Sequence, residues 1–163
     1  MGEILGVGVT HYPGLIQTDA NMASLLNRTL NSDQVPASAK DPKAWPAQMR
    51  EEWQDPVASA KEHRRRLVNG FRKAREAIDA FKPDFVVIFG DDQYENFREE
   101  GVPSFCVFLQ EEIESHPFAR YFMGNTNVWG EGKDTVVKTK GHKAGASYIA
   151  AKLIAADYDV SYA

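Results

Sequence analysis

The sequence contains a single cysteine, Cys106, in 163 residues. One cysteine cannot form a disulfide within the chain, and it excludes a zinc site built from cysteine pairs. Cys106 lies in an apolar segment that predicts a strand, so we expect a buried and unreactive thiol. A chain without disulfides is typical of a reducing compartment, and we therefore expect a cytoplasmic protein.

Positive charge is also scarce, because 19 Lys and Arg face 23 Asp and Glu and the formal net charge is −4. The one basic cluster, His63–Arg66, falls inside a helical pattern and predicts a solvated helix face. No basic region followed by a long apolar core marks a signal peptide, and no run approaches the ~18 apolar residues that span a bilayer. We therefore expect neither nucleic acid nor a membrane as a partner.

Several catalytic motifs are missing as well. The sequence has no Gly-x-Ser-x-Gly elbow, no phosphate-binding P-loop and no His-Glu-x-x-His. The pair Gly6 and Gly8 lacks the third glycine and the helix start of a dinucleotide-binding loop. These absences argue against serine hydrolase, nucleotide-binding and zinc-protease chemistry.

Two short apolar runs, each followed by polar residues, are the most informative features that are present. Phe85–Phe89 predicts a strand covered on both faces, and Ile4–Val9 predicts a second one. His11 follows one run, and the acidic loop Asp91–Asn96 follows the other. Ligands of open α/β sheets bind beyond the carboxyl ends of the strands, so both positions are candidates for a site. The alternative is a solvated acidic turn and a structural or exposed histidine.

Helical spacing of apolar residues predicts helices over 18–32, 57–81 and 143–156, and strands are predicted at 102–109 and 158–162. With 43% hydrophobic and 26% charged residues, the chain has the composition of one globular domain. We expect an α/β fold over residues 1–163, with a central mixed, largely parallel sheet and helices on both faces. The strand pattern at the end predicts either closure of the sheet or the N-terminal part of a longer domain.

Residues 33–56 carry four prolines together with Trp45 and Trp53. Proline at this density argues against a continuous helix or a central strand. We expect a long excursion with a short helix near Pro46–Trp53. The segment is either a functional cover or a stretch held to the surface by its two tryptophans.

Two histidines and one carboxylate form the ligand set of non-haem Fe(II) oxygenases. His11 is one candidate ligand, and the acidic loop offers a carboxylate from Asp91, Asp92 or Glu95. The second histidine ligand would be one of three residues: His63, His116 and His142. Their spacing in the sequence does not favour any one of them.

The order of short motifs along the chain adds a further indication. Val86-Val87-Ile88-Phe89 is followed by Asp92-Gln93-Tyr94-Glu95-Asn96-Phe97 and then by Pro103-Ser104-Phe105-Cys106. Thr10-His11-Tyr12-Pro13 stands near the N-terminus, and Lys140-Gly141-His142 precedes the last predicted helix. In this order the motifs resemble those of the class III extradiol ring-cleavage dioxygenases, the protocatechuate 4,5-dioxygenase superfamily.

The resemblance implies catabolism of aromatic compounds, by cleavage of a dihydroxylated ring with O2 at a non-haem Fe(II) site. It implies that His11 is a metal ligand and that Gln93 occupies the position of the family's second iron-binding histidine. A glutamine amide is a neutral and weaker ligand than imidazole. Asp92, Tyr94 and Glu95 would contact the substrate or support the ligands.

The family's catalytic base and its glutamate ligand fall beyond position 163, so the resemblance names no catalytic residue in this chain. We therefore expect residues 1–163 to be inactive alone and to need a complementing subunit or further polypeptide. A homo-oligomer is also compatible with the resemblance. The alternative function is that of a non-catalytic relative, which binds a small molecule or a protein through the same cleft. Gln93 favours this alternative.

Overall fold

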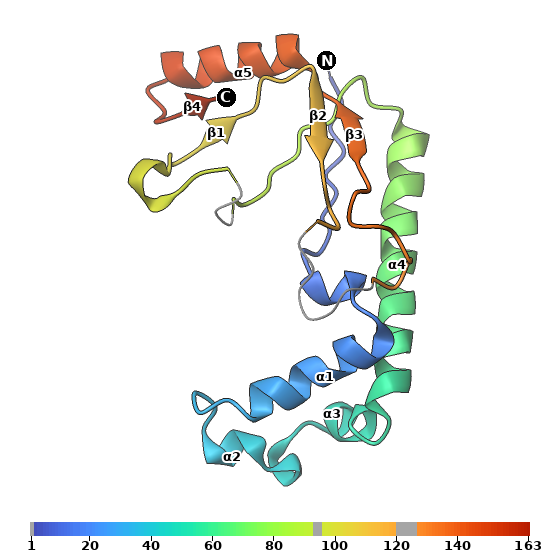
Figure 1. Cartoon of the computed structure of the whole chain (residues 1–163). Coiled ribbons are helices and arrows are strands. Elements are labelled where there is room, and N and C mark those ends of the chain that lie inside the picture. The colour runs from blue at the N-terminus through green and yellow to red at the C-terminus, as the bar shows by residue number, and fades with distance from the viewer. Residues whose placement is uncertain (1, 93–95, 120–126) are drawn as a thin grey trace. The chain divides into compact units, whose positions relative to one another are not determined.

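A computed structural model describes residues 2–92, 96–119 and 127–163 (Figure 1). The chain divides into two compact units, each described by itself. The helical unit comprises Met1–Pro83 and Phe118–Lys133, and the strand-bearing unit comprises Asp84–Pro117 and Asp134–Ala163. Within the described ranges, no helix is both long and apolar enough to cross a membrane.

The helical unit is organised by its longest helix, α4 (Pro56–Phe81). The Asp55 carboxylate accepts a hydrogen bond from the backbone N–H of Ala58, and Pro56 stands at the first position, where a missing N–H costs nothing. The helix ends at Phe81, because the next residue, Lys82, has a left-handed φ of 53° and Pro83 prevents continuation. The predicted helix over 57–81 is confirmed.

The helix α1 (Asp19–Leu30) packs against α4 in the same unit (Figure 1). The side chain of Thr18 caps it by accepting from the N–H of Asn21. Met22 on α1 and Ala60 on α4 are among the few buried apolar side chains of the unit. The 3-10 turn η1 (Pro13–Ile16) leads into α1, and Gln17 forms an antiparallel bridge with Asn127.

The proline-rich segment between α1 and α4 folds into three short pieces: α2 (Ala37–Lys40), η2 (Pro42–Ala44) and α3 (Ala47–Glu52). In Figure 1, α3 lies next to the beginning of α4, and α2 lies below α1. Trp45 is 6% exposed, and its indole N–H donates to the carbonyl of Ala39 at 2.8 Å. Trp53 meets the Trp45 ring edge-on, with centroids 5.4 Å apart. The two tryptophans therefore hold the segment in place, and the short helix predicted near Pro46–Trp53 is confirmed.

Arg64 corrects the expectation that the whole basic cluster is solvated. Its side chain is buried, its Nε lies 3.0 Å from Asp19 Oδ1, and its guanidinium donates to the carbonyls of Leu15 and Gln17. A buried guanidinium needs such partners, because desolvation of an unpaired charge is costly. Arg64 thus ties α4 to the turn before α1.

We expect Arg64→Ala to lower the free energy of unfolding of the helical unit by roughly 1.5 to 3 kcal/mol, the usual contribution of a hydrogen bond to a charged group. Urea unfolding followed by helical circular dichroism measures it. Arg65→Ala is the matched control, because Arg65 is exposed and pairs with Glu62 on the same helix face. That surface pair contributes less than about 1 kcal/mol. Equal losses in both variants would contradict a role for Arg64 in holding the unit.

The strand-bearing unit contains two sheets of two strands each. β1 (Cys106–Val107) pairs in parallel with β4 (Ser161–Tyr162), and α5 (Lys143–Ala155) packs on β1 (Figure 1). The parallel pair confirms strands at the centre of 102–109 and in 158–162, and α5 confirms the helix predicted over 143–156. The short turn η3 (Glu99–Gly101) precedes β1.

The second sheet is an antiparallel pair, β2 (Glu112–Ser115) and β3 (Val137–Lys140). Lys138 lies 3.1 Å from Glu112 and 3.5 Å from Glu114, so opposite charges face each other across the ladder. Gly141 closes the pair by donating its N–H to the carbonyl of Glu111, and a Cβ there would overlap the carbonyl of Gln110.

The fold is therefore mixed α/β and mostly helical, and the predicted central, largely parallel sheet is not present among the described residues. Neither Ile4–Val9 nor Phe85–Phe89 is assigned to a strand, and every side chain of Phe85–Phe89 is exposed. The physical reason is that a strand is stabilised by a hydrogen-bonded partner. An apolar run indicates that a segment favours burial, but it does not specify the strand that covers it.

Candidate functional site

His11, the predicted metal ligand, lies between the apolar run Ile4–Val9 and the turn η1 of the helical unit. Its side chain is exposed. The next residue, Tyr12, contacts His63 of α4 edge-on, with ring centroids 5.8 Å apart. The turn η1 allows this placement, because a Cβ at Gly14 would overlap the Tyr12 ring. Glycine at position 14 thus leaves room for the aromatic side chain next to His11.

The acidic loop belongs to the strand-bearing unit, and Asp92 organises it. One carboxylate oxygen of Asp92 accepts from the backbone N–H of Asn96 at 2.9 Å and from the Asn96 side-chain amide at 2.8 Å. The other accepts from the N–H of Phe97 at 3.1 Å. Asp92 therefore holds the two ends of the loop together, which is a supporting role. The predicted site residues Gln93, Tyr94 and Glu95 lie outside the described residues.

The three histidines considered as a second ligand have separate local contacts. His63 contacts Tyr12, and His116 Nε2 lies 3.2 Å from Glu114 Oε1. His142 caps α5, because its Nδ1 accepts from the backbone N–H of Gly145 at 2.9 Å, and its ring lies 5.7 Å from that of Phe85. The sequence signal for this cap was available: a polar side chain directly before an apolar helical pattern.

No group of three or more His, Cys, Asp and Glu side chains that could hold a metal ion occurs among the residues that the structure describes. His11 belongs to the helical unit, and Asp91 and Asp92 belong to the strand-bearing unit. Within each unit, the described residues therefore form no iron site by themselves. Cys106 is no substitute, because partial burial raises the pKa of its thiol and disfavours the thiolate that binds metals.

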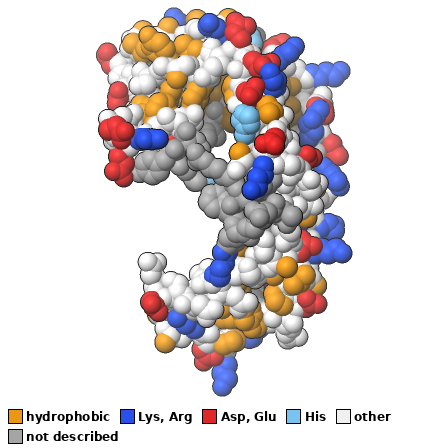
Figure 2. Space-filling model, in the orientation of Figure 1, with side chains coloured by type: hydrophobic (Ala, Val, Ile, Leu, Met, Phe, Trp, Pro, Cys, Tyr) orange, Lys and Arg blue, Asp and Glu red, His pale blue; other side chains and the backbone are white. Residues whose placement is uncertain are grey.

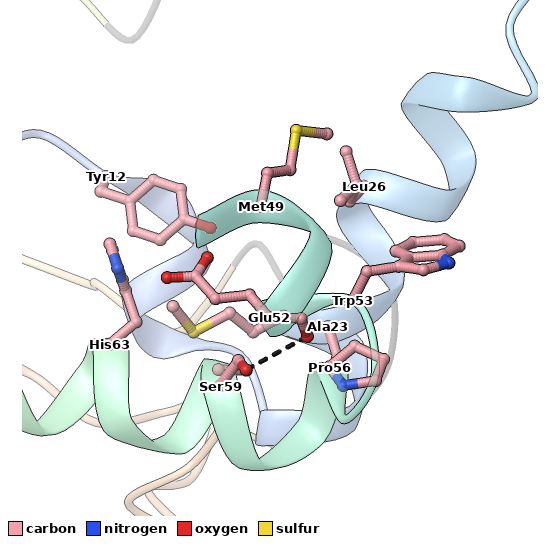
Figure 3. Close-up of a pocket in the computed structure, with 11 residues that line it drawn as sticks. Tyr12, Ala23, Leu26, Met49, Glu52, Trp53, Pro56, Ser59 and His63 are labelled. Carbon is pink, nitrogen blue, oxygen red and sulfur yellow. Dashed lines mark hydrogen bonds between the residues drawn. The ribbon is translucent and has the colours of Figure 1, made fainter. Parts of the chain in front are cut away.

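An open pocket of about 160 Å³, with Glu52 and His63 exposed to solvent, lies on the helical unit and was not anticipated from the sequence (Figure 3). Tyr12, α1, α3 and the beginning of α4 form its wall. The close-up shows Tyr12, Glu52 and His63 together at one end, with Trp53, Leu26 and Pro56 at the other. The sequence signal for this pocket was the segment rich in proline and tryptophan, which was predicted to be either a functional cover or a stretch held to the surface. That prediction does not say which residues line a pocket.

Comparison with known proteins gives two short matches. The chain is 44% identical over 36 residues to 2,3-dihydroxyphenylpropionate/2,3-dihydroxicinnamic acid 1,2-dioxygenases of Burkholderia vietnamiensis and Paraburkholderia phymatum. The match covers 22% of this chain and 11% of each relative, so the aligned segment spans about a tenth of their length. No family model and no solved structure matches the chain. The comparisons thus establish a partial similarity to extradiol ring-cleavage dioxygenases.

Proposed function

We propose that this chain is part of a class III extradiol dioxygenase, in which O2 cleaves a dihydroxylated aromatic ring at a non-haem Fe(II) site. The observation that carries the proposal is the 44% identity over 36 residues to two ring-cleavage dioxygenases. The motif order along the sequence also supports it. The substrate would be an aromatic diol of the kind named for the relatives.

In this proposal residues 1–163 act as one cytoplasmic domain of the protocatechuate 4,5-dioxygenase type, or the N-terminal part of one, that contributes some of the iron ligands. His11 supplies an imidazole, and Gln93 stands at the second ligand position. Asp92 supports the loop through its bonds to Asn96 and Phe97. Tyr94 and Glu95 contact the substrate or support the ligands. The remaining ligand and the base come from another polypeptide segment, because the resemblance places both beyond position 163.

Anaerobic calorimetric titration with Fe(II) tests the ligand role of His11. Loss of a supporting residue around a metal already costs roughly 10- to 100-fold in affinity, so His11→Ala should lower Fe(II) affinity at least that far. His116→Ala is the matched control, since His116 is a half-exposed histidine that pairs with Glu114. We expect its affinity to equal that of the parent. An unchanged affinity in His11→Ala would contradict the proposal.

A second candidate function is that of a non-catalytic relative that binds a small molecule or a protein. The observation that favours it is Gln93, a neutral amide at the position where the family has an imidazole. Gln93→His separates the two functions in a complemented enzyme. A gain in Fe(II) affinity with turnover retained supports the dioxygenase with a poor ligand. Turnover absent from both parent and variant supports the binding protein.

A further inference from the structure

The strand β1 has one paired edge and one free edge. On the paired edge, the carbonyls of Phe105 and Val107 accept hydrogen bonds from the β4 segment at 2.9 Å and 3.2 Å. Successive residues of a strand turn their backbone groups to opposite edges, so the N–H and C=O groups of Cys106 and Phe108 point away from β4. Neither residue has a backbone hydrogen-bond partner among the residues that the structure describes. This free edge can therefore accept an extended segment.

The segment of β1 is apolar on both faces. Leu109 and Tyr162 line a hollow together with Ala150 of α5, so the face that carries these two side chains lies against α5. Side chains alternate along a strand, which places Phe108 on the opposite face, where its ring lies 6.4 Å from that of Phe97. A segment added at the free edge therefore lies beside apolar side chains on both of its faces.

The run Phe85–Phe89 matches this edge in length and character. It consists of five consecutive apolar residues, as does Phe105–Leu109. It belongs to no helix and no strand, and its side chains are between 51% and 94% exposed. A continuous apolar run supplies an apolar side chain to both faces of a sheet, which a strand of alternating polarity does not. The run and the edge belong to the same unit, yet within one chain they are not paired.

The other sheet edges of the unit suit this run less well. In the sheet of β2 and β3, Lys138 lies 3.1 Å from Glu112 and 3.5 Å from Glu114. An apolar strand added there would lie beside charged side chains, which protect a sheet edge from association. The segment before β4 carries Asp159, whose carboxylate accepts from the hydroxyl of Ser104 at 2.8 Å. The edge of β1 is therefore the best acceptor for the run.

We propose that the free edge of β1 is a docking site for the run Phe85–Phe89 of a second copy of this chain. Each copy carries one run and one free edge, so two copies related by a two-fold axis satisfy both edges of the pair and close the assembly. Two equivalent pairings also double the buried area of a contact that is short by itself. The association requires neither metal nor substrate, so its failure would leave the proposed dioxygenase function untouched.

Disulfide trapping with Cys106, the only cysteine of the chain, tests the pairing. When the two five-residue segments overlap fully, Cys106 lies opposite Val86 in a parallel pair and opposite Ile88 in an antiparallel pair. The parent is mixed with a Cys106→Ala chain that carries Val86→Cys or Ile88→Cys, and the mixture is oxidised mildly. A bond between Cys106 and the new cysteine then joins two different copies. We expect one of the two chains to give this bond, identified by peptide mass spectrometry.

Val57→Cys in the same Cys106→Ala chain is the matched control, because Val57 is exposed on α4 and away from both segments. We expect no bond from it to Cys106. A bond from neither position of the run would overturn the proposal, and so would equal yields from the run and from the Val57→Cys control.

A second pair of variants tests the acceptor edge. Phe108→Pro removes an N–H from the free edge and places a ring there, without removing a hydrogen bond to β4. The dissociation constant of the dimer should rise about tenfold or more. Phe108→Ala removes the same aromatic side chain but keeps the N–H, so it should retain the mass of two chains in light scattering. Circular dichroism verifies that both variants are folded. Equal association of folded Phe108→Pro and Phe108→Ala, or a parent mass that spreads beyond two chains, would refute the closed pair.

Discussion

Residues 1–163 alone, supplied with Fe(II), O2 and 2,3-dihydroxyphenylpropionate, are expected to form no detectable ring-opened product. The described residues contain no group of three metal-binding side chains, and the resemblance assigns the base and the glutamate ligand to positions outside this sequence. A general base typically contributes about 100- to 10,000-fold to a rate, and loss of a metal ligand is added to that loss. The yellow absorbance of the ring-opened product and O2 consumption provide the measurement.

The matched experiment adds a polypeptide that carries the missing ligand and base to the same reaction. We expect product to appear only in the mixture of both chains, and His11→Ala in this chain should remove it again. Rapid, O2-dependent ring cleavage by residues 1–163 alone would show that the catalytic groups lie within this chain. It would also refute the proposal that this chain supplies only metal ligands and supporting residues and no catalytic base.

The helices were predictable because their signals are local. An apolar stripe over several turns of α4, together with Asp55 before the helix and Pro83 after it, defines the helix within a residue or two. The strands were less predictable because pairing depends on distant residues. β1 was anticipated by its apolar segment, but β2 consists of exposed side chains and is stabilised by its partner β3. The two apolar runs Ile4–Val9 and Phe85–Phe89 have the pattern of strands, but no nearby residue specifies a partner strand.

For the candidate sites too, features with a local sequence signal were predictable and features that depend on distant residues were not. His11 and the acidic loop were identified from their positions directly after apolar runs. The burial of Arg64 could not be predicted from the sequence, because its partners Asp19 and Leu15 are 45 and 49 residues away in the chain. The pocket likewise combines side chains from α1, α3 and α4. Its existence depends on the packing of these helices, which helical periodicity alone does not specify.

The exposed apolar run Phe85–Phe89 is expected to cause self-association of the isolated chain. Its five side chains are between 51% and 94% exposed, and Ile88 is 83% exposed. Adjacent apolar residues that belong to no helix and no paired strand favour edge-to-edge association. Figure 2 shows further hydrophobic side chains at the surface in the region of α5, where Tyr148 and Ile154 are exposed.

Ile88→Lys should reduce this association, because a charge within an unpaired apolar segment opposes pairing with a second chain. Light scattering after size exclusion measures the mass, and the fluorescence of a hydrophobic dye measures the exposed apolar surface. We expect a lower mean mass and several-fold weaker dye fluorescence, with unchanged helical circular dichroism because the run carries no helix. Val57→Lys is the control, since Val57 is a single exposed residue on α4, and isolated surface apolar residues are normal.

The complementing polypeptide provides the decisive comparison for this run. If the polypeptide that restores ring cleavage also pairs with Phe85–Phe89, its addition to the parent chain should lower dye fluorescence as far as Ile88→Lys does. The Ile88→Lys variant should then bind that polypeptide less tightly, because a lysine in a strand covered on both faces is costly to bury. A parent chain that is monomeric and silent toward the dye at micromolar concentration would contradict this account, since the run would then be covered by the chain itself.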